Sequence, residues 1–227
     1  MRNLFSIILI ILSSMSLAAA PQKKGPTCVD GDCMNGKGKL LYASGAYYIG
    51  EFKDGAPEGK GELAFPDGTI YKGDFRKGKS DGKGSMKWKN GSSYEGEWKD
   101  GQLNGEGKLI SETGQIFIGT FKDGQLTGKG KTILKDGSVI TGMFDKGMLN
   151  GKGEMKNPNG MSYAGEYKEN ERCGQGTMVM PDGSRYTGEW KNDQPNGYGE
   201  MTDPKGIVSK GMWKFGELLE DKGTTAQ

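Results

Sequence analysis

Tyr71-Lys72-Gly73-Asp74-Phe75 is one copy of an aromatic-x-Gly-x-aromatic motif that recurs every 23 residues between Tyr48 and Trp213. Eight copies, two of them with a non-aromatic first residue, occupy that stretch of the 227-residue chain. A fixed period in this range is typical of solenoids and arrays, in which each unit buries its apolar face only against its neighbours. The sequence therefore predicts one small structural unit written eight times.

Glycines mark the same places in every unit. Each copy begins with Gly-x-Gly, as in Gly59-Lys60-Gly61, and a further glycine follows seven residues later, often after Asp or Asn, as in Asp67-Gly68. Such pairs supply the positive φ of a tight turn. A slot after the second strand holds glycine in six copies and Asn170 or Asp193 in the others, which predicts a left-handed backbone there. We therefore expect each unit to run strand, tight turn, strand, loop.

The alternation of side chains along a strand assigns these residues to two faces. Tyr71, Gly73 and Phe75 share one face, and Lys72 and Asp74 share the other. Apolar residues make up only 33% of the chain, whereas 41 residues are glycine. Because the glycines fall in register, a thin sheet with one ring-bearing face and one charged face explains this composition better than disorder does.

The repeated Tyr-x-Gly-x-Trp/Phe, Lys-Asp-Gly and Gly-x-Gly elements resemble the MORN (membrane occupation and recognition nexus) family over most of the chain. The resemblance implies an all-β fold, an elongated, twisted single-layer antiparallel sheet of about eight tandem β-hairpins with a shallow aromatic groove. Ile140 and Ser209 depart from the pattern by replacing the first aromatic residue of their copies. The expected organisation is a signal peptide (1–20), a disulfide hairpin cap (21–35), eight repeats (36–219) and a C-terminal tail (220–227). The segment from Glu217 to Lys222, which spans the end of the last repeat and the start of the tail, is compatible with a short helix.

The first twenty residues have the pattern of a secretory signal. Arg2 precedes an apolar run from Leu4 to Leu12, and small residues follow it. An uncleaved membrane anchor is the alternative, but the run is far shorter than the ~20 residues that span a bilayer. Cleavage after Ala18, Ala19 or Ala20 stays open. We expect an exported protein that is periplasmic, envelope-associated or extracellular.

The three cysteines fit an oxidising compartment. Cys28 and Cys33 flank Asp30-Gly31, a favoured centre of a two-residue hairpin, which would set the two cysteines opposite each other. We expect a disulfide between them that caps the first edge of the array. A metal site is the alternative, yet it lacks two ligands and the chain has no His. Cys173 is expected to be a free thiol.

No catalytic constellation or cofactor motif is present in the sequence. The absence of His excludes a His-based triad, and the carboxylates that recur once per unit, such as Glu51 and Asp74, are interpreted as solvated sheet surface. The formal net charge of +2 indicates neither nucleic acid nor an anionic membrane surface as a partner. We expect no enzyme activity, no cofactor and no metal.

The aromatic stripe is the candidate binding surface. Aromatic side chains are favoured anchors for a docked segment, although the same rings would also serve as the core of a thin sheet. The preferred partner is another protein, bound as a peptide or helix along the groove; the alternative is envelope glycan or a phospholipid surface. The oligomeric state is not predicted. The stripe comprises Tyr48, Phe52, Tyr71, Phe75, Tyr94, Trp98, Phe117, Phe121, Phe144, Tyr163, Tyr167, Tyr186, Trp190 and Trp213.

Overall fold

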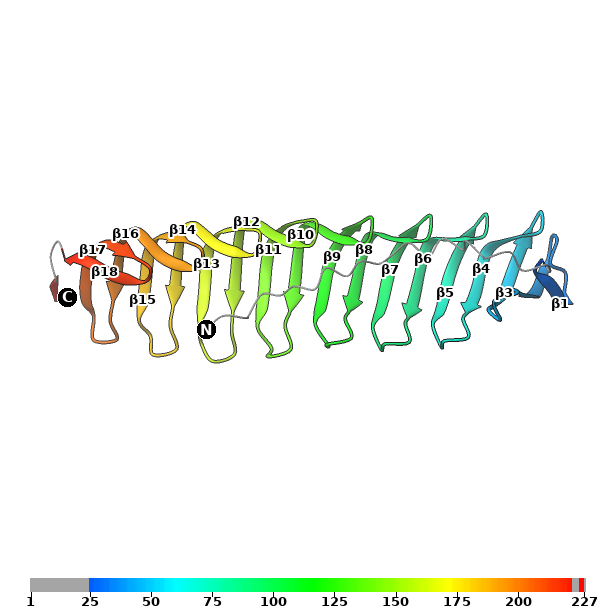
Figure 1. Ribbon diagram of the computed structural model, residues 1–227, viewed down its shortest axis with the longest axis horizontal. Helices are drawn as coiled ribbons and strands as arrows, with labels where there is room; N and C mark the ends of the chain where they lie inside the picture. The colour runs from blue at the N-terminus through cyan, green and yellow to red at the C-terminus, as the bar shows by residue number, and fades with distance from the viewer. Residues whose placement is uncertain (1–24, 222–224, 227) are drawn as a thin grey trace. The chain divides into compact units, whose positions relative to one another are not determined.

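A computed structural model describes residues 25–221 and 225–226 of the chain (Figure 1). The predicted signal peptide lies outside the described residues. The chain divides into two compact units, an N-terminal unit that ends at Gln125 and a C-terminal unit that begins at Leu126. The described residues form strands and turns without any helix, and so none that could cross a membrane.

Each unit is an open antiparallel sheet in which every strand up to β18 pairs with the next one in the sequence. This order confirms the predicted all-β fold of tandem hairpins. The N-terminal unit holds β1 (Thr27–Gly31), β2 (Lys37–Leu41), β3 (Tyr47–Lys53), β4 (Ala56–Ala64), β5 (Ile70–Arg76), β6 (Lys79–Lys87), β7 (Ser93–Lys99), β8 (Gln102–Ile110) and β9 (Ile116–Lys122). The C-terminal unit holds β10 (Gln125–Ile133), β11 (Val139–Asp145), β12 (Met148–Lys156), β13 (Ser162–Lys168), β14 (Glu171–Val179), β15 (Arg185–Lys191), β16 (Gln194–Thr202), β17 (Ile207–Lys214), β18 (Glu217–Asp221) and β19 (Thr225–Ala226), which pairs with β17.

The tight turns lie at the opposite ends of the strands from where the sequence placed them. Lys77 and Gly78 connect β5 to β6 with φ values of 49° and 78°, the two positive angles of a type I′ hairpin turn. The Asp67-Gly68 segment instead lies in a longer connection, where the Gly68 amide donates to the Phe65 carbonyl and the Phe65 amide donates to the Thr69 carbonyl. The predicted order of turn and loop is therefore wrong, although the predicted left-handed backbone after the second strand is confirmed, at Asn170 and Asp193 as well as at the glycines.

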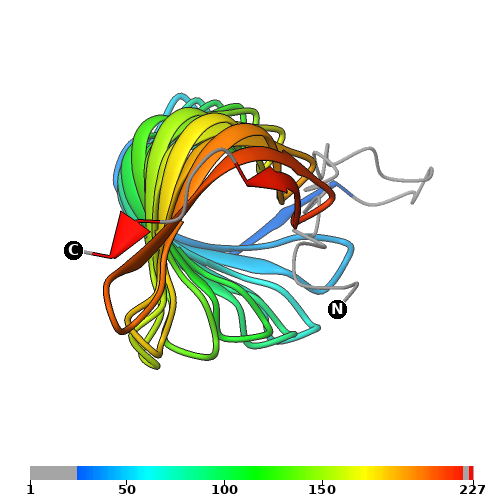
Figure 2. The ribbon, with the colours of Figure 1, turned by 90° about the vertical axis from the view of Figure 1, so that its left-hand side faces the viewer.

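The strands bend sharply at their central glycines. The ring centroids of Tyr71 and Phe75 are 5.1 Å apart, whereas residues four apart on a straight strand are separated by about 13 Å. A β-bulge makes the bend: between the pairs Gly73/Gly84 and Phe75/Ser80, the single residue Asp74 of β5 faces three residues of β6. Figure 2 shows this curvature of the strands in each unit. The ring-bearing face is consequently the inner side of the bend.

A row of glycines crosses each sheet at the bend. Gly61 pairs with Gly73, Gly73 with Gly84 and Gly84 with Gly96, and an equivalent row runs from Gly130 through the C-terminal unit. A Cβ atom on Gly84 would collide with the ring of Tyr71. The row therefore gives each tyrosine ring a flat surface on which to lie, as the sequence pattern predicted.

The two ends of the array differ in detail from the predictions. Cys28 and Cys33 do form a disulfide. However, Cys28 pairs in the ladder with Leu40, because β1 joins β2 across residues 32–36 and not through a two-residue turn at Asp30-Gly31. At the other end the predicted helix is wrong. Phe215 and Gly216 form another turn with positive φ, so Glu217 pairs with Lys214 and the segment continues as β18.

Candidate functional site

The predicted binding rings form the core of the two sheets. All fourteen side chains of the stripe are buried except that of Phe117, which is partly exposed; Tyr48 and Tyr186 have no exposed surface and Trp213 has 8%. The structure thus brings the predicted residues together on one face within each unit. Their role as a docking surface stays a prediction, because most of their area is already in contact with the protein itself.

Most of the rings pack edge to face in a series, which runs from Phe52 to Phe121 in the N-terminal unit and from Tyr167 to Trp213 in the C-terminal unit. Tyr71 contacts Phe75 of its own strand and Trp98 of the next hairpin, with centroid distances of 5.1 and 5.0 Å and interplanar angles of 89° and 83°. The C-terminal unit repeats this arrangement, for example between Tyr163 and Trp190 at 5.1 Å. Such geometry places the positive edge of one ring on the negative face of another. Within each series, a hairpin is therefore joined to its neighbour by a tyrosine ring that contacts an aromatic ring of both hairpins.

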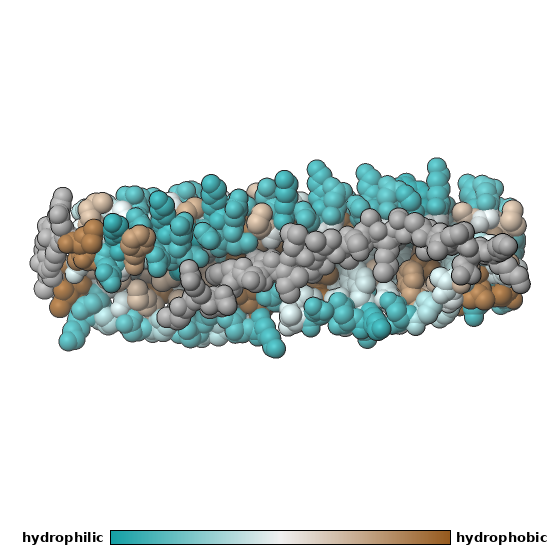
Figure 3. Space-filling model, viewed as in Figure 1, coloured by the Kyte–Doolittle hydropathy of each residue, from teal (hydrophilic) through white to brown (hydrophobic). Residues whose placement is uncertain are grey.

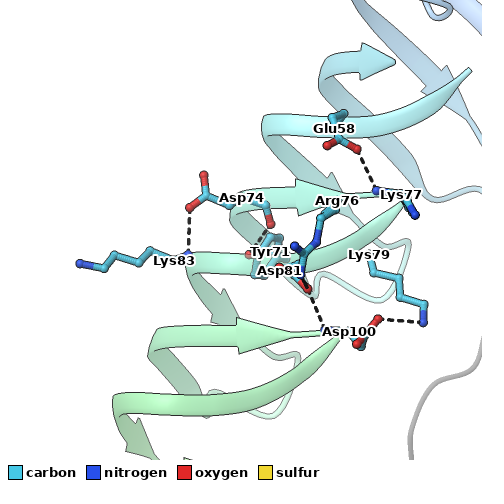
Figure 4. Close-up of polar contacts among 9 residues, drawn as sticks. All are labelled: Glu58, Tyr71, Asp74, Arg76, Lys77, Lys79, Asp81, Lys83 and Asp100. Carbon is cyan, nitrogen blue, oxygen red and sulfur yellow. Dashed lines mark hydrogen bonds and ion pairs between the residues drawn. The ribbon is translucent and has the colours of Figure 1, made fainter. Parts of the chain in front are cut away.

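The hydroxyl groups of five tyrosines and the indole N–H groups of three tryptophans are satisfied inside the core. The Tyr71 hydroxyl donates to the carbonyl of Asp74 at 3.0 Å (Figure 4), and the other four tyrosines at this position make the same bond three residues along. The indole N–H of Trp98 donates to the Gly84 carbonyl at 3.1 Å. These bonds compensate for ladder bonds that the bulge removes, so they help to hold the bend in place.

Burial of the tyrosines makes the fold sensitive to alkali. Burial, together with the charge of Glu97, raises the pKa of Tyr94 from 10.0 to about 12, and burial with the charge of Glu189 raises that of Tyr186 to about 12. A raised folded-state pKa contributes stability below pH 10 that is lost as the pH rises toward 12. We expect unfolding and tyrosine ionisation to occur together above pH 10, as followed by far-UV circular dichroism and absorbance at 295 nm. Complete ionisation near pH 10 with an unchanged dichroism spectrum would contradict this.

Arg172 is a partly buried residue beside the rings that sequence analysis missed. Its guanidinium lies 4.7 Å from the centroid of the Trp190 ring, and its Nε donates to Asp193 at 2.9 Å. Corresponding positions of neighbouring units hold apolar side chains such as Leu149. The signal that could have revealed it is Asp193, which replaces a turn glycine and places a carboxylate within reach of the cation. The pair thereby keeps a partly buried charge beside the rings of this unit.

The accessible part of the ring-bearing face consists of apolar side chains beside the rings. Leu63 and Met86 are partly exposed in the N-terminal unit, as are Phe65 and Trp88 at the starts of the connections that follow β4 and β6. Met178 is a counterpart in the C-terminal unit. Figure 3 shows apolar residues between two rows of hydrophilic side chains. A partner that approaches this face would meet these residues before it meets the rings.

The charged face carries two shallow hollows. One, of about 490 Å³, lies over Gly73, Gly84 and Gly96, and another, of about 560 Å³, lies over Gly142, Gly153 and Gly165. Several charges at the first hollow are paired with each other or with neighbours: Lys60 with Asp74 at 2.6 Å and Lys72 with Glu62 at 2.8 Å. Exposed pairs of this kind contribute little stability, and they leave little unbalanced charge for a ligand.

The recurring carboxylate of the charged face supports the bulge. Asp74 accepts a hydrogen bond from the backbone N–H of Lys83 at 2.9 Å (Figure 4), and Glu166 and Glu189 accept equivalent bonds. A Cβ atom at Gly82 would strike the Asp74 side chain. These carboxylates are therefore structural in addition to being solvated. The described residues contain no cluster of three or more acidic, Cys or His side chains suited to a metal ion.

A second side-chain position ties several hairpins to the next one. Glu58 accepts a hydrogen bond from the amide of the turn residue Lys77 at 2.9 Å, and Asp81 does so from Asp100 at 3.3 Å (Figure 4). Asn150 accepts a hydrogen bond from the backbone amide of Glu169 in the same way. Cys173 occupies this position in its unit. Burial raises the pKa of its thiol, so the sulfur is protonated at neutral pH and is a poor acceptor.

Replacing Cys173 with asparagine should stabilise the protein. The new side-chain oxygen would accept a hydrogen bond from the backbone N–H of Asn192, as Asn150 does from Glu169. One such hydrogen bond contributes about 1 kcal/mol to stability. The urea midpoint of C173N should rise, and that of the matched variant N150C should fall. Equal midpoints for both variants and the wild type would show that this side-chain position carries no stability.

Comparison with known proteins identifies the repeat. The sequence profile of the MORN repeat matches eight consecutive segments, at residues 34–47, 48–70, 71–93, 94–116, 117–139, 141–162, 163–185 and 186–208. These segments cover most of the chain and confirm the predicted eight copies. The last match ends before Ser209, and six of the eight segments begin at the first aromatic residue of a copy. A search of curated proteins found no match.

Among solved structures, the chain is similar to domains of the CPAP protein. The TCP10 domain of Danio rerio CPAP, solved with a peptide of Danio rerio STIL, is 13% identical, with 88% of this chain and 100% of that chain covered and a TM-score of 0.43. The SAS-4 (dCPAP) TCP domain of Drosophila melanogaster, solved with a proline-rich motif of Ana2 (dSTIL), is 10% identical, with coverages of 86% and 84% and a TM-score of 0.34. These scores are too low to support conclusions about this chain.

Proposed function

Because the chain belongs to the MORN-repeat family, we propose that it is an exported, non-catalytic scaffold that binds another protein. The partner docks as a peptide or helix along the ring-bearing face. Two features support export: the signal-like segment at residues 1–20 and the disulfide between Cys28 and Cys33. Disulfides persist in oxidising compartments such as the periplasm and the extracellular space.

The observation that carries the proposal is the partly exposed apolar lining of the inner face. Phe65 and Trp88 occupy equivalent positions in two consecutive repeats. Leu63 and Met86, which are also partly exposed, precede them by two residues in the same two repeats. Aromatic and Met side chains are enriched where proteins bind other proteins. The buried rings beneath them fix the backbone, so the lining is held in place before a partner arrives and little order has to be gained on binding.

The opposite face offers a weaker case for a ligand. Several of its charged side chains form ion pairs with residues of the neighbouring strand, as Lys72 does with Glu62. The first hollow lies over glycines, which offer a ligand only backbone atoms. Envelope glycan or phospholipid, bound through the inner rings, is the alternative occupant of the proposed surface. It predicts co-sedimentation with peptidoglycan or with liposomes.

The test compares two faces of one unit. The double variant F65A/W88A removes partly exposed side chains of the inner face, and the matched control I49A/I118A removes exposed side chains of the charged face. A protein recovered with the wild type from its native envelope fraction should be lost from F65A/W88A and retained by I49A/I118A, with both variants melting near the wild-type temperature. The proposal fails if the inner-face variant retains the partner, or if only peptidoglycan or liposomes are bound.

A further inference from the structure

Three successive long connections of the N-terminal unit each begin with an aromatic side chain on the inner face. Tyr42, Phe65 and Trp88 follow β2, β4 and β6 directly, lie 23 residues apart and are partly exposed. Their backbones have the same conformation, because the amide of each residue donates to the carbonyl four residues ahead. The next repeat holds the buried Ser111 at this position, so the aromatic row ends there and belongs wholly to the N-terminal unit.

Two of these three side chains carry a hydrogen-bond donor that has no acceptor among the described residues. The indole N–H groups of the three buried tryptophans donate to glycine carbonyls, as Trp98 does to Gly84, but that of Trp88 forms no such bond. The hydroxyl of Tyr42 likewise has no partner in the described part of the chain, whereas that of Tyr48 donates to a backbone carbonyl. Partly buried Trp and Tyr side chains usually find a partner for their polar end. The row therefore offers apolar rings together with two unused donors.

The spacing of the row favours one conformation of a bound segment. Equivalent residues of consecutive repeats are two strands apart, so neighbouring rings are separated by about 9.6 Å along the sheet. A polyproline II helix has three residues per turn and rises ~3.1 Å per residue, so its side chains return to one side every ~9.3 Å. An extended strand presents side chains to one side about every 6.7 Å, and an α-helix needs about 10.5 Å, or seven residues, to return to the same side. One turn of polyproline II helix per hairpin therefore matches the row better than the other two conformations do.

The unused donors favour the same conformation. A polyproline II helix has no internal hydrogen bonds, so its backbone carbonyls are available to accept from the Trp88 indole and the Tyr42 hydroxyl. In an α-helix the carbonyls are used internally, except in the last turn. Aromatic-lined grooves suit proline-rich segments for a further reason, since such segments are ordered before they bind. Spacing, apolar contact and hydrogen bonding thus point to one kind of partner.

We propose that the inner face of the N-terminal unit binds a proline-rich segment in the polyproline II conformation, which lies across Tyr42, Phe65 and Trp88. This inference rests on the proposed function and narrows its class of partner. A segment of nine residues, about 28 Å long, spans the three positions with one apolar side chain per hairpin. Its carbonyls accept hydrogen bonds from Trp88 and Tyr42 at the two ends of the row, and Phe65 holds the central turn by apolar contact alone.

Two synthetic nonapeptides, acetylated and amidated at their ends, test the proposal on the folded chain. One consists of three Leu-Pro-Pro units and carries its leucines at the spacing of the row. The other consists of three Leu-Gly-Gly units and keeps the leucines on a flexible backbone. Titration followed by NMR should show saturable binding of the Leu-Pro-Pro peptide, with the indole proton of Trp88 shifted downfield. The Leu-Gly-Gly peptide should bind at least about tenfold more weakly, because its backbone must be ordered on binding.

Substitutions of Trp88 locate the bound peptide. W88F keeps a ring and removes the indole N–H, so the affinity for the Leu-Pro-Pro peptide should fall about fivefold, the effect of one hydrogen bond. W88A also removes the apolar contact and should weaken binding further. The control M180A removes a partly exposed side chain at the equivalent position of a repeat in the C-terminal unit and should bind as the wild type. Thermal melts near the wild-type temperature confirm that the changes act on binding and not on folding.

Several results would overturn the proposal. It is excluded if the Leu-Pro-Pro peptide shows no saturable binding, if the two nonapeptides bind equally well, or if W88F and W88A both bind as the wild type. An amphipathic helical peptide that binds at this row when the Leu-Pro-Pro peptide does not would exclude a polyproline II partner and leave the proposed docking function standing. Failure of the docking function itself would show separately, as retention of the native partner by F65A/W88A.

Discussion

Replacing Gly84 with alanine is expected to destabilise the protein by more than about 3 kcal/mol, the range that follows from severe overpacking. The added Cβ would lie 2.6 Å from Cζ and 2.7 Å from Cε2 of the Tyr71 ring, closer than van der Waals contact allows. Tyr71 cannot move aside freely, because Phe75 and Trp98 hold its ring on two sides. The thermal midpoint of G84A, measured by circular dichroism, should fall by well over 10 °C or the variant should not fold.

Gly91 provides the matched control for this substitution. It lies in the connection between β6 and β7 with a φ of 86°, and no atom lies within 4 Å of where its Cβ would be. Alanine there should cost about 1–2 kcal/mol, which is the strain of a left-handed backbone alone. Equal losses for G84A and G91A would show that crowding against the ring is not what requires glycine at the bend.

Replacing Tyr71 with alanine should cost about 3–5 kcal/mol, as for other large aromatic side chains removed from a core. The ring is 2% exposed and contacts both Phe75 and Trp98, so its loss leaves a cavity between two hairpins. Urea denaturation should show a large fall in midpoint for Y71A.

The variant Y71F separates the ring from its hydroxyl. It keeps the edge-to-face contacts and removes only the bond to the Asp74 carbonyl, so a loss of about 1 kcal/mol is expected. Phe117 occupies the corresponding position in its own unit, which shows that the fold accommodates a ring without the hydroxyl. A Y71F variant as unstable as Y71A would mean that the hydrogen bond, and not the packing of the ring, dominates.

Much of the fold follows from the sequence because its period exposes the strand geometry. Tyr71, Gly73 and Phe75 alternate with charged residues, and this alternation predicted the two faces that the structure has. The tight turn was misplaced because both connections contain a glycine. Its first residue varies from Asp54 to Lys77 to Phe215, so it carries no compositional signal, although its backbone has the same positive φ each time.

The bend of the strands could not be predicted from local preference. It depends on a bulge in which Asp74 faces three residues of the next strand, a pairing that is fixed only when both strands are placed. The burial of the rings depends on that bend, so the sequence identified the right residues and their possible role as the core without showing how the bend packs them against one another. The Arg172–Asp193 pair was missed for a similar reason, since its two residues lie on neighbouring hairpins 21 residues apart.

The central claim is that each tyrosine ring lies flat on the row of glycines and is held there by the second aromatic ring of the next hairpin. Nuclear Overhauser spectroscopy on the folded chain tests this directly through the α-protons of Gly84 and the ring protons of Tyr71 and Trp98. The account predicts cross-peaks between Tyr71 and both partners, with Gly84 α-protons shifted upfield by the ring current. Glycine shifts near random-coil values, with no cross-peak between Tyr71 and Gly84 or Trp98, would contradict it.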